Sequence, residues 1–156
     1  MSIMREDISS SGRTTVVYIE VDRSNALLMQ CLLGSRNNYT LHHAYDGASG
    51  LELCKCVKPD LVITEMHLPD VTAYEVLRVL RDDSATTDTP CIVLSGDAMP
   101  AHIERALAGG FYGYWTKPID IWQLMQNIED VATATFSRMY RGRDTMPAAA
   151  NRISAI

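Results

Sequence analysis

Five short apolar runs alternate with segments of helical periodicity along this chain. After each run come a polar loop and then apolar residues that recur every three or four positions, which is the spacing of an amphipathic helix. Strands that are short and apolar throughout are typical of parallel sheets covered by helices on both faces. The pattern therefore predicts a doubly wound α/β fold with a five-stranded parallel sheet. The runs lie at residues 16–19, 39–44, 61–64, 90–94 and 112–115.

Length and composition indicate one soluble globular domain. The chain has 156 residues, 47% of them hydrophobic and 21% charged, with a net charge of −5 that argues against a nucleic-acid-binding surface. No apolar run approaches the roughly 18 residues of a membrane span, and residues 1–15 lack the apolar centre of a signal peptide. We therefore expect a cytoplasmic protein with a flexible N-terminal arm (1–13), a domain at 14–135 and a tail at 136–156 that is partly helical or disordered.

Polar and charged residues stand where the predicted strands end. Glu20 and Asp22 follow the first run and are expected to form an acidic pocket. Glu65 follows the third run, Ser95 the fourth and Lys117 the fifth. The carboxyl ends of parallel strands share one edge of the sheet, and the functional crevice of such sheets lies there. The cysteine and histidine spacings fit no metal motif, so we expect no metal centre and no cofactor.

Four segments resemble the receiver domain of two-component response regulators, over about residues 14–133. They read VVYIEVDRSN, PDLVITEMHLPDVTAYEVL, CIVLSGDAMP and YGYWTKPID, and within the family they are most similar to receivers of hybrid histidine kinases. The distances from Glu65 also match the family: thirty positions to Ser95, forty-nine to Tyr114 and fifty-two to Lys117. The resemblance implies a flavodoxin-like sheet in the order 2-1-3-4-5.

The resemblance also implies a chemistry, the transfer of a phosphoryl group from a kinase histidine to an aspartate with the help of a divalent cation. In this family a lysine pairs with the phosphoryl group, a Ser or Thr hydroxyl moves to bind it, and a tyrosine turns inward. Carried over to this chain, Ser95 is the switch hydroxyl, Tyr114 the switch aromatic and Lys117 the pairing lysine. The Lys117–Pro118 bond is expected to be cis.

Two departures from the family pattern affect the reaction. Glu65 stands at the aspartate position, and its extra methylene moves the carboxylate by roughly 1.5 Å, more than in-line transfer tolerates. Val21 stands where similar receivers carry a metal-binding acid. Asp22 should point elsewhere because it lies one residue further on. A weaker departure is Ala73 in place of a glycine.

These departures favour a pseudo-receiver, which is not an enzyme and acts by binding another protein. Glu65 pairs with Lys117 in this hypothesis, either as a partial mimic of the phosphorylated state or as an inert polar cluster. The alternative is a working phosphorelay receiver that uses Mg²⁺ and an unusual acceptor, Glu65 or Asp22. An unrelated enzyme or nucleotide-binding protein of this fold is disfavoured, because no glycine-rich phosphate loop follows the first strand.

The predicted partner is a histidine kinase or another signalling protein, with neither nucleic acid nor membrane involved. Aromatic residues cluster near the fifth strand, and aromatic anchors are common in protein interfaces. They would lie on the face formed by the fourth helix, the fifth strand and the fifth helix, through which a homodimer is also expected. The predicted contact residues are Tyr112, Trp115 and Trp122.

Overall fold

The structure is a computed structural model that describes residues 12–141 and 153–154. The described residues form a sheet of six strands in the order β2-β1-β3-β4-β5-β6, and every neighbouring pair is parallel. The five predicted strands and their order are confirmed. The strands are β1 (Thr14–Ile19), β2 (Tyr39–Ala44), β3 (Leu61–Thr64), β4 (Cys91–Ser95), β5 (Gly113–Thr116) and β6 (Ile153–Ser154).

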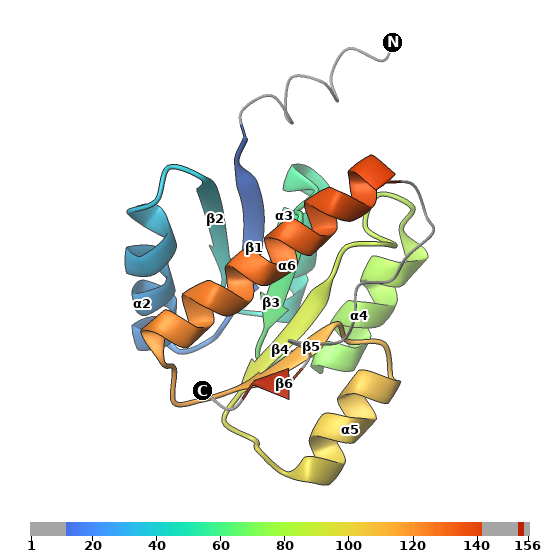
Figure 1. The fold of residues 1–156 in the computed structure, drawn as a ribbon. Coiled ribbons are helices and arrows are strands. Elements are labelled where there is room, and N and C mark those ends of the chain that lie inside the picture. The colour runs from blue at the N-terminus through green and yellow to red at the C-terminus, as the bar shows by residue number, and fades with distance from the viewer. Residues whose placement is uncertain (1–11, 142–152, 155–156) are drawn as a thin grey trace.

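Helices cover both faces of this sheet (Figure 1). Two of them, α2 and α6, pack on one face, and the other three pack on the opposite face. The sequence predicts these two layers of helices, and the structure confirms them. The described helices are α2 (Arg23–Gly34), α3 (Gly47–Val57), α4 (Ala73–Asp82), α5 (Pro100–Ala108) and α6 (Ile121–Arg141).

Each strand supplies both faces of the core, because successive side chains of a strand point in opposite directions. In β1, Val16 and Tyr18 pack with the buried residues of α2 and α6. Val17 and Ile19 pack instead with those of α3, α4 and α5. All four side chains are fully buried. The sheet is therefore held rigidly between its two layers, and its carboxyl ends are fixed with it.

Four helices that begin at this carboxyl end have side-chain caps, and in α6 the cap is Asp120, whose Oδ1 accepts the N–H of Gln123. The carboxylate of Asp22 accepts the N–H groups of Ser24 and Asn25 at the start of α2. Asp46 caps α3, and Thr72 forms a reciprocal capping box with Glu75 at the start of α4. Each such cap stabilises its helix by about 1 kcal/mol. The caps define where the loops at this end of the sheet stop.

The loop between β3 and α4 is tied to the start of α3. Both carboxylate oxygens of Asp70 accept hydrogen bonds there, from Gly47 N at 2.8 Å and Ala48 N at 2.9 Å. These bonds lower the pKa of Asp70 below its ordinary value. A side chain at Gly47 would collide with Val71, whose Cγ2 lies 2.1 Å from the position of an added Cβ. Glycine is thus required for this close approach.

Helix α6 continues six residues into the predicted tail, to Arg141, and the two residues of β6 add an unpredicted strand beside β5. The other residues of the tail lie outside the described part of the chain. The sequence beyond residue 135 lacks clear periodicity, but Ala134, Arg138 and Met139 favour helix formation. The predicted arm, except for residues 12 and 13, lies outside the described residues.

None of the helices in the described part of the chain is both long enough and apolar enough to cross a membrane.

Candidate functional site

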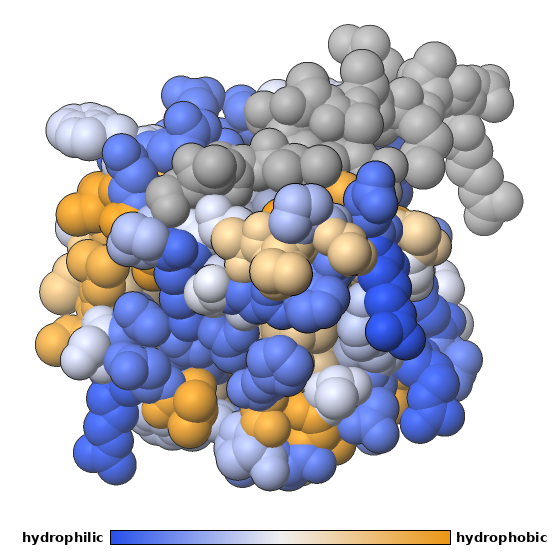
Figure 2. Space-filling model, turned by 90° about the horizontal axis from the view of Figure 1, so that it is seen from below, coloured by the Kyte–Doolittle hydropathy of each residue, from blue (hydrophilic) through white to orange (hydrophobic). Residues whose placement is uncertain are grey.

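The predicted polar residues meet at the carboxyl edge of the sheet, which we call the rim. Figure 2 shows this end of the molecule, where hydrophilic side chains separate several hydrophobic patches. Glu20 follows β1, Glu65 follows β3, Ser95 ends β4 and Lys117 follows β5. Because these strands are adjacent in the order β1-β3-β4-β5, the four residues come from neighbouring positions.

Lys117 is the centre of the rim. Its Nζ donates to Glu20 Oε1 and to Glu65 Oε2, both at 2.6 Å. The side chains are little exposed, at 18% for Lys117, 1% for Glu20 and 13% for Glu65. Charge-assisted hydrogen bonds of this length are strong in such surroundings. The pairing of Glu65 with Lys117, which the sequence suggested, is confirmed.

The two carboxylates keep Lys117 charged despite its burial. Burial alone would lower the pKa of Lys117, because it disfavours the ammonium form. The hydrogen bonds and charges of Glu20 and Glu65 outweigh that effect, and the net pKa lies above its ordinary value. Lys117 is therefore a permanent cation between two acids at physiological pH.

Both carboxylate oxygens of Glu65 are engaged. While Oε2 binds Lys117, Oε1 accepts the backbone N–H of Met66 at 2.8 Å. The backbone of Glu65 is fixed as well, since its N–H donates to the carbonyl of Ile19 at 3.0 Å. The glutamate side chain, which is longer than that of an aspartate, thus binds both the backbone of its own loop and Lys117.

Glu20 shares one oxygen between two donors. Its Oε1 accepts Asn25 Nδ2 at 2.7 Å in addition to Lys117, whereas Oε2 is buried with no hydrogen-bond partner. The next residue, Val21, is 49% exposed and offers no ligand. Asp22 is also exposed, and its carboxylate caps α2. Its side chain therefore points elsewhere, as expected, and its place beside Glu20 in the predicted acidic pocket is wrong. The carboxylate of Asp22 binds the free N–H groups at the start of α2 instead of joining Glu20.

These residues offer a magnesium ion few free ligands. Magnesium requires near-ideal octahedral geometry, with oxygen ligands that include carboxylates. Two acids remain at the rim, and the ammonium of Lys117 already lies between them. Among the residues that the structure describes, there is no group of three His, Cys, Asp or Glu residues that could hold a metal ion.

The other half of the rim contains the predicted switch residues, Ser95 and Tyr114. Tyr114 is fully buried, and its hydroxyl donates to the backbone carbonyl of Asp97 at 2.6 Å. Ser95 is 2% exposed, and its Oγ accepts the N–H of Asp97 at 3.3 Å. Burial raises the pKa of Tyr114, which lies within hydrogen-bonding reach of Ser95. The aromatic ring therefore points inward.

The backbone after β5 is held against β4. The N–H of Lys117 donates to the carbonyl of Ser95 at 2.9 Å. The Lys117–Pro118 peptide bond is cis, in agreement with the sequence expectation. Together these features fix the point from which the lysine side chain enters the rim.

The three residues predicted to contact a partner have different environments. Trp122 is 83% exposed at the start of α6, and Tyr112 is half-buried before β5. Trp115 is fully buried and packs in the core between the sheet and α6, so its prediction as a contact residue is wrong. The alternation of strand β5 explains the error, because Trp115 points to a covered face of the sheet.

Two residues of the site were not singled out from the sequence. Asn25 binds Glu20 from the first turn of α2, and it is the last residue of the EVDRSN segment that carried part of the resemblance. Asp97 contributes its backbone to both switch residues from the loop after β4. The position of Asp97, two residues after the end of a strand, could have pointed to it. The hydrogen bonds of its backbone have no signal in the sequence.

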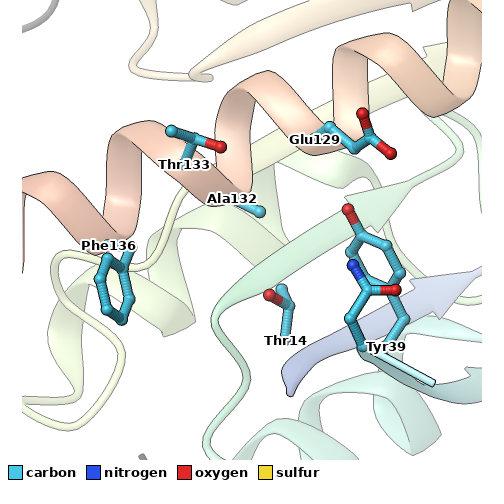
Figure 3. A pocket seen from close by; sticks show the side chains of 7 residues that line it. Thr14, Tyr39, Glu129, Ala132, Thr133 and Phe136 are labelled. Atoms are coloured by element: carbon cyan, nitrogen blue, oxygen red, sulfur yellow. The ribbon is translucent and has the colours of Figure 1, made fainter. Parts of the chain in front are cut away.

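A separate cavity of about 360 Å³ lies at the opposite, amino end of the sheet. Figure 3 shows its lining, which comes from α6, from the first residues of β1 and β2, and from the residue before β2. It shares no residue with the rim. Its lining residues are Thr14, Asn38, Tyr39, Glu129, Ala132, Thr133 and Phe136.

Comparisons with known proteins agree with this architecture. The chain is 29% identical over 115 residues to the polar-differentiation response regulator DivK of Brucella anthropi, covering 74% of this chain and 93% of the relative. It is 27% identical to the signal receiver domain of an HD domain-containing protein from Pseudomonas fluorescens, with a TM-score of 0.74 and coverages of 84% and 95%.

A third similarity, to the receiver domain of a sensor histidine kinase from Pseudomonas aeruginosa, concerns the fold alone. The identity is 20% and the TM-score 0.70, over 78% of this chain and 98% of the other, and that structure holds a magnesium ion in its active site cleft. Residues 16–129 of the present chain match the response regulator receiver domain family. Because this match spans most of the chain, the protein belongs to the response regulator receiver domain family.

Proposed function

We propose that this protein is a pseudo-receiver, which acts in two-component or phosphorelay signalling by binding a protein partner and without phosphorylation of its acceptor position. The proposal rests on the position of Lys117 between the two acids of the rim. Its ammonium binds both remaining acids of the rim at 2.6 Å. The cation that phosphoryl transfer needs would have to displace this lysine and find a third ligand, which Val21 does not supply.

The switch half of the rim supports a fixed signalling state. Tyr114 is already inward, and its hydroxyl is bonded to the loop after β4. Glu65 supplies about one negative charge to Lys117, whereas a phosphoryl group carries about 1.5 to 2. We therefore propose that Glu65 acts as a constitutive but partial mimic of the phosphorylated acceptor.

For the partner, we propose a histidine kinase or another signalling protein in the cytoplasm, bound through the face formed by α5, β5 and α6. Exposed aromatic residues serve as anchors in interfaces, and Trp122 is the most exposed large hydrophobic residue among those described. Ile121, 43% exposed, lies beside it on α6. A homodimer would use the same face, whose β5 edge is paired with β6.

The proposal is tested by intact-mass spectrometry after incubation of the full chain with Mg²⁺ and acetyl phosphate. We expect no gain of a phosphoryl group in the wild type. The matched control is the double variant Val21→Asp/Glu65→Asp, which restores both missing acids. This variant should gain one phosphoryl group, because it provides the acceptor and the metal ligand together.

Phosphorylation of the wild type at Glu65 or Asp22 would overturn the proposal and favour the alternative, a working Mg²⁺-dependent phosphorelay receiver. Peptide mapping assigns the modified residue. The mimicry is tested separately with Glu65→Ala in a pull-down. Unchanged capture of the partner that the wild type binds would reduce Glu65 to an inert part of the polar cluster.

A further inference from the structure

The loop between β4 and α5 contains a side-chain hydrogen bond that the phosphoryl chemistry does not explain. The carboxylate of Asp97 lies 2.5 Å from His102 Nδ1, and its other oxygen accepts the N–H of Met99 at 3.1 Å. Met99 is the cap residue of α5 and makes no side-chain capping bond. Asp97 therefore takes over the anchoring of this helix start and ties the loop to the first turn of α5.

The backbone of the same residue holds both switch residues. The carbonyl of Asp97 accepts the Tyr114 hydroxyl at 2.6 Å, and its N–H donates to Ser95 Oγ at 3.3 Å. The side chain and the backbone of one residue thus connect α5 with the inward tyrosine. A displacement of this loop would remove the acceptor of the buried Tyr114 hydroxyl, and a buried donor without its acceptor is costly.

We propose that Asp97 and His102 form a latch that holds Tyr114 inward by fixing the carbonyl of residue 97. The Asp97–His102 contact is the adjustable part, because the two side chains are 22% and 56% exposed. Tyr114, by contrast, is fully buried. Asp97 and His102 are positioning residues, since neither side chain touches Glu65 or Lys117 through any contact that the structure shows.

The electrostatics of Asp97 agree with this role. The N–H of Met99 and the hydrogen bond to His102 lower the pKa of Asp97 below its ordinary value. The carboxylate thus stays ionised and available as an acceptor. The charge of His67, from the loop after β3, acts in the same direction.

The latch explains how a switch tyrosine stays inward without a phosphoryl group. The regulatory meaning of the latch rests on the proposed function. Its geometry is tested by nitration with tetranitromethane, followed by peptide mass spectrometry of Tyr114. Tyr45, which is 49% exposed, provides the internal reference for an accessible tyrosine. Phosphorylation and partner binding do not enter this measurement, so the latch and the proposed function can fail separately.

The full-length variants to compare are Asp97→Ala, His102→Ala and His102→Gln, with Glu104→Ala as a control on the exposed side of α5. We expect nitration of Tyr114 relative to Tyr45 to rise about tenfold in Asp97→Ala, in keeping with the loss of a charge-assisted bond. The rise should be smaller in His102→Ala and should disappear in His102→Gln, whose amide can donate to Asp97. Glu104→Ala should match the wild type.

Tyr114 nitration within about twofold of the wild type in both alanine variants would overturn the latch. Failure of His102→Gln to restore protection would also contradict it, because a donor at that position is what the latch requires. If thermal unfolding shows that Asp97→Ala does not fold, Asp97→Asn takes its place. Asparagine keeps the acceptor for Met99, so the His102 contact alone is then weakened.

Discussion

The two halves of the rim have diverged to different degrees. The acceptor half, with Glu20, Val21 and Glu65, departs from the receiver pattern, whereas the switch half keeps its serine and tyrosine. The acceptor half is nevertheless well ordered. Lys117, which agrees with the receiver pattern, binds both acids of this half. The difference shows that a polar site can lose residues that its reaction needs while its remaining charged side chains still pair with one another.

The comparison extends to how each half is held. In the acceptor half, charge fixes the side chains, since one ammonium lies between two carboxylates. In the switch half, backbone groups do so, because Ser95 and Tyr114 both bond to the main chain of Asp97. Charges that are desolvated cost more when they lose a partner than neutral hydroxyls do. The two halves should therefore respond very differently to mutation.

The largest effect is expected for Lys117→Met in the acceptor half. This change leaves two little-exposed carboxylates without their cation, and breaking such a pair costs about 3 kcal/mol of unfolding free energy. Urea unfolding monitored by circular dichroism measures the loss. Lys55→Met, at an exposed position on α3, is the control and should change stability by less than about 0.5 kcal/mol.

A second variant isolates the cause of that loss. Adding Glu20→Gln to Lys117→Met removes the most buried of the unpaired charges and should recover part of the stability. The losses of unfolding free energy of the two single variants are added and compared with the loss of the double variant. If the double variant loses as much as this sum, the pairing with Lys117 does not stabilise the acceptor half, and the proposed difference between the two halves is wrong.

A smaller effect is expected for Tyr114→Phe in the switch half. The ring and its packing are kept, and only the bond to the Asp97 carbonyl is lost, which costs about 1 kcal/mol. Tyr45→Phe removes an exposed hydroxyl and provides the matched control. A loss from Tyr114→Phe that equals or exceeds that of Lys117→Met would show that the neutral half is the more strongly held.

The fold and the members of the rim were predictable, because both follow from where apolar runs end. Glu20, Glu65, Ser95 and Lys117 each come directly after or at the end of a strand, and a parallel sheet brings such positions together. The pairing of Glu65 with Lys117 followed from their charges.

The errors arise where one residue has two possible partners. Asp22 stood close enough to the first strand to join the acids, but the free N–H groups of α2 bind it instead. Trp115 was assigned to the surface because aromatics cluster there in sequence, although the face of β5 toward which it points is covered by α6. Strand β6 is two residues long, too short for any pattern to indicate it. Side-chain direction and competition between partners are tertiary properties.

The smallest effect concerns the pH dependence of the acceptor half. The pKa of Lys117 in the folded protein lies above its ordinary value of 10.5, so the folded state binds this proton more tightly than the unfolded state does. The stabilisation from Lys117 is therefore fully present below pH 10.5 and is lost as the pH rises through the folded-state pKa. Urea unfolding of the wild type and of Lys117→Met, from about pH 9 to about pH 11.5, measures the difference. We expect the gap in unfolding free energy to narrow across this range. A gap that stays constant or widens would mean that the charge on Lys117 does not hold the two acids, and the acceptor half would then resemble the switch half in being held by neutral contacts.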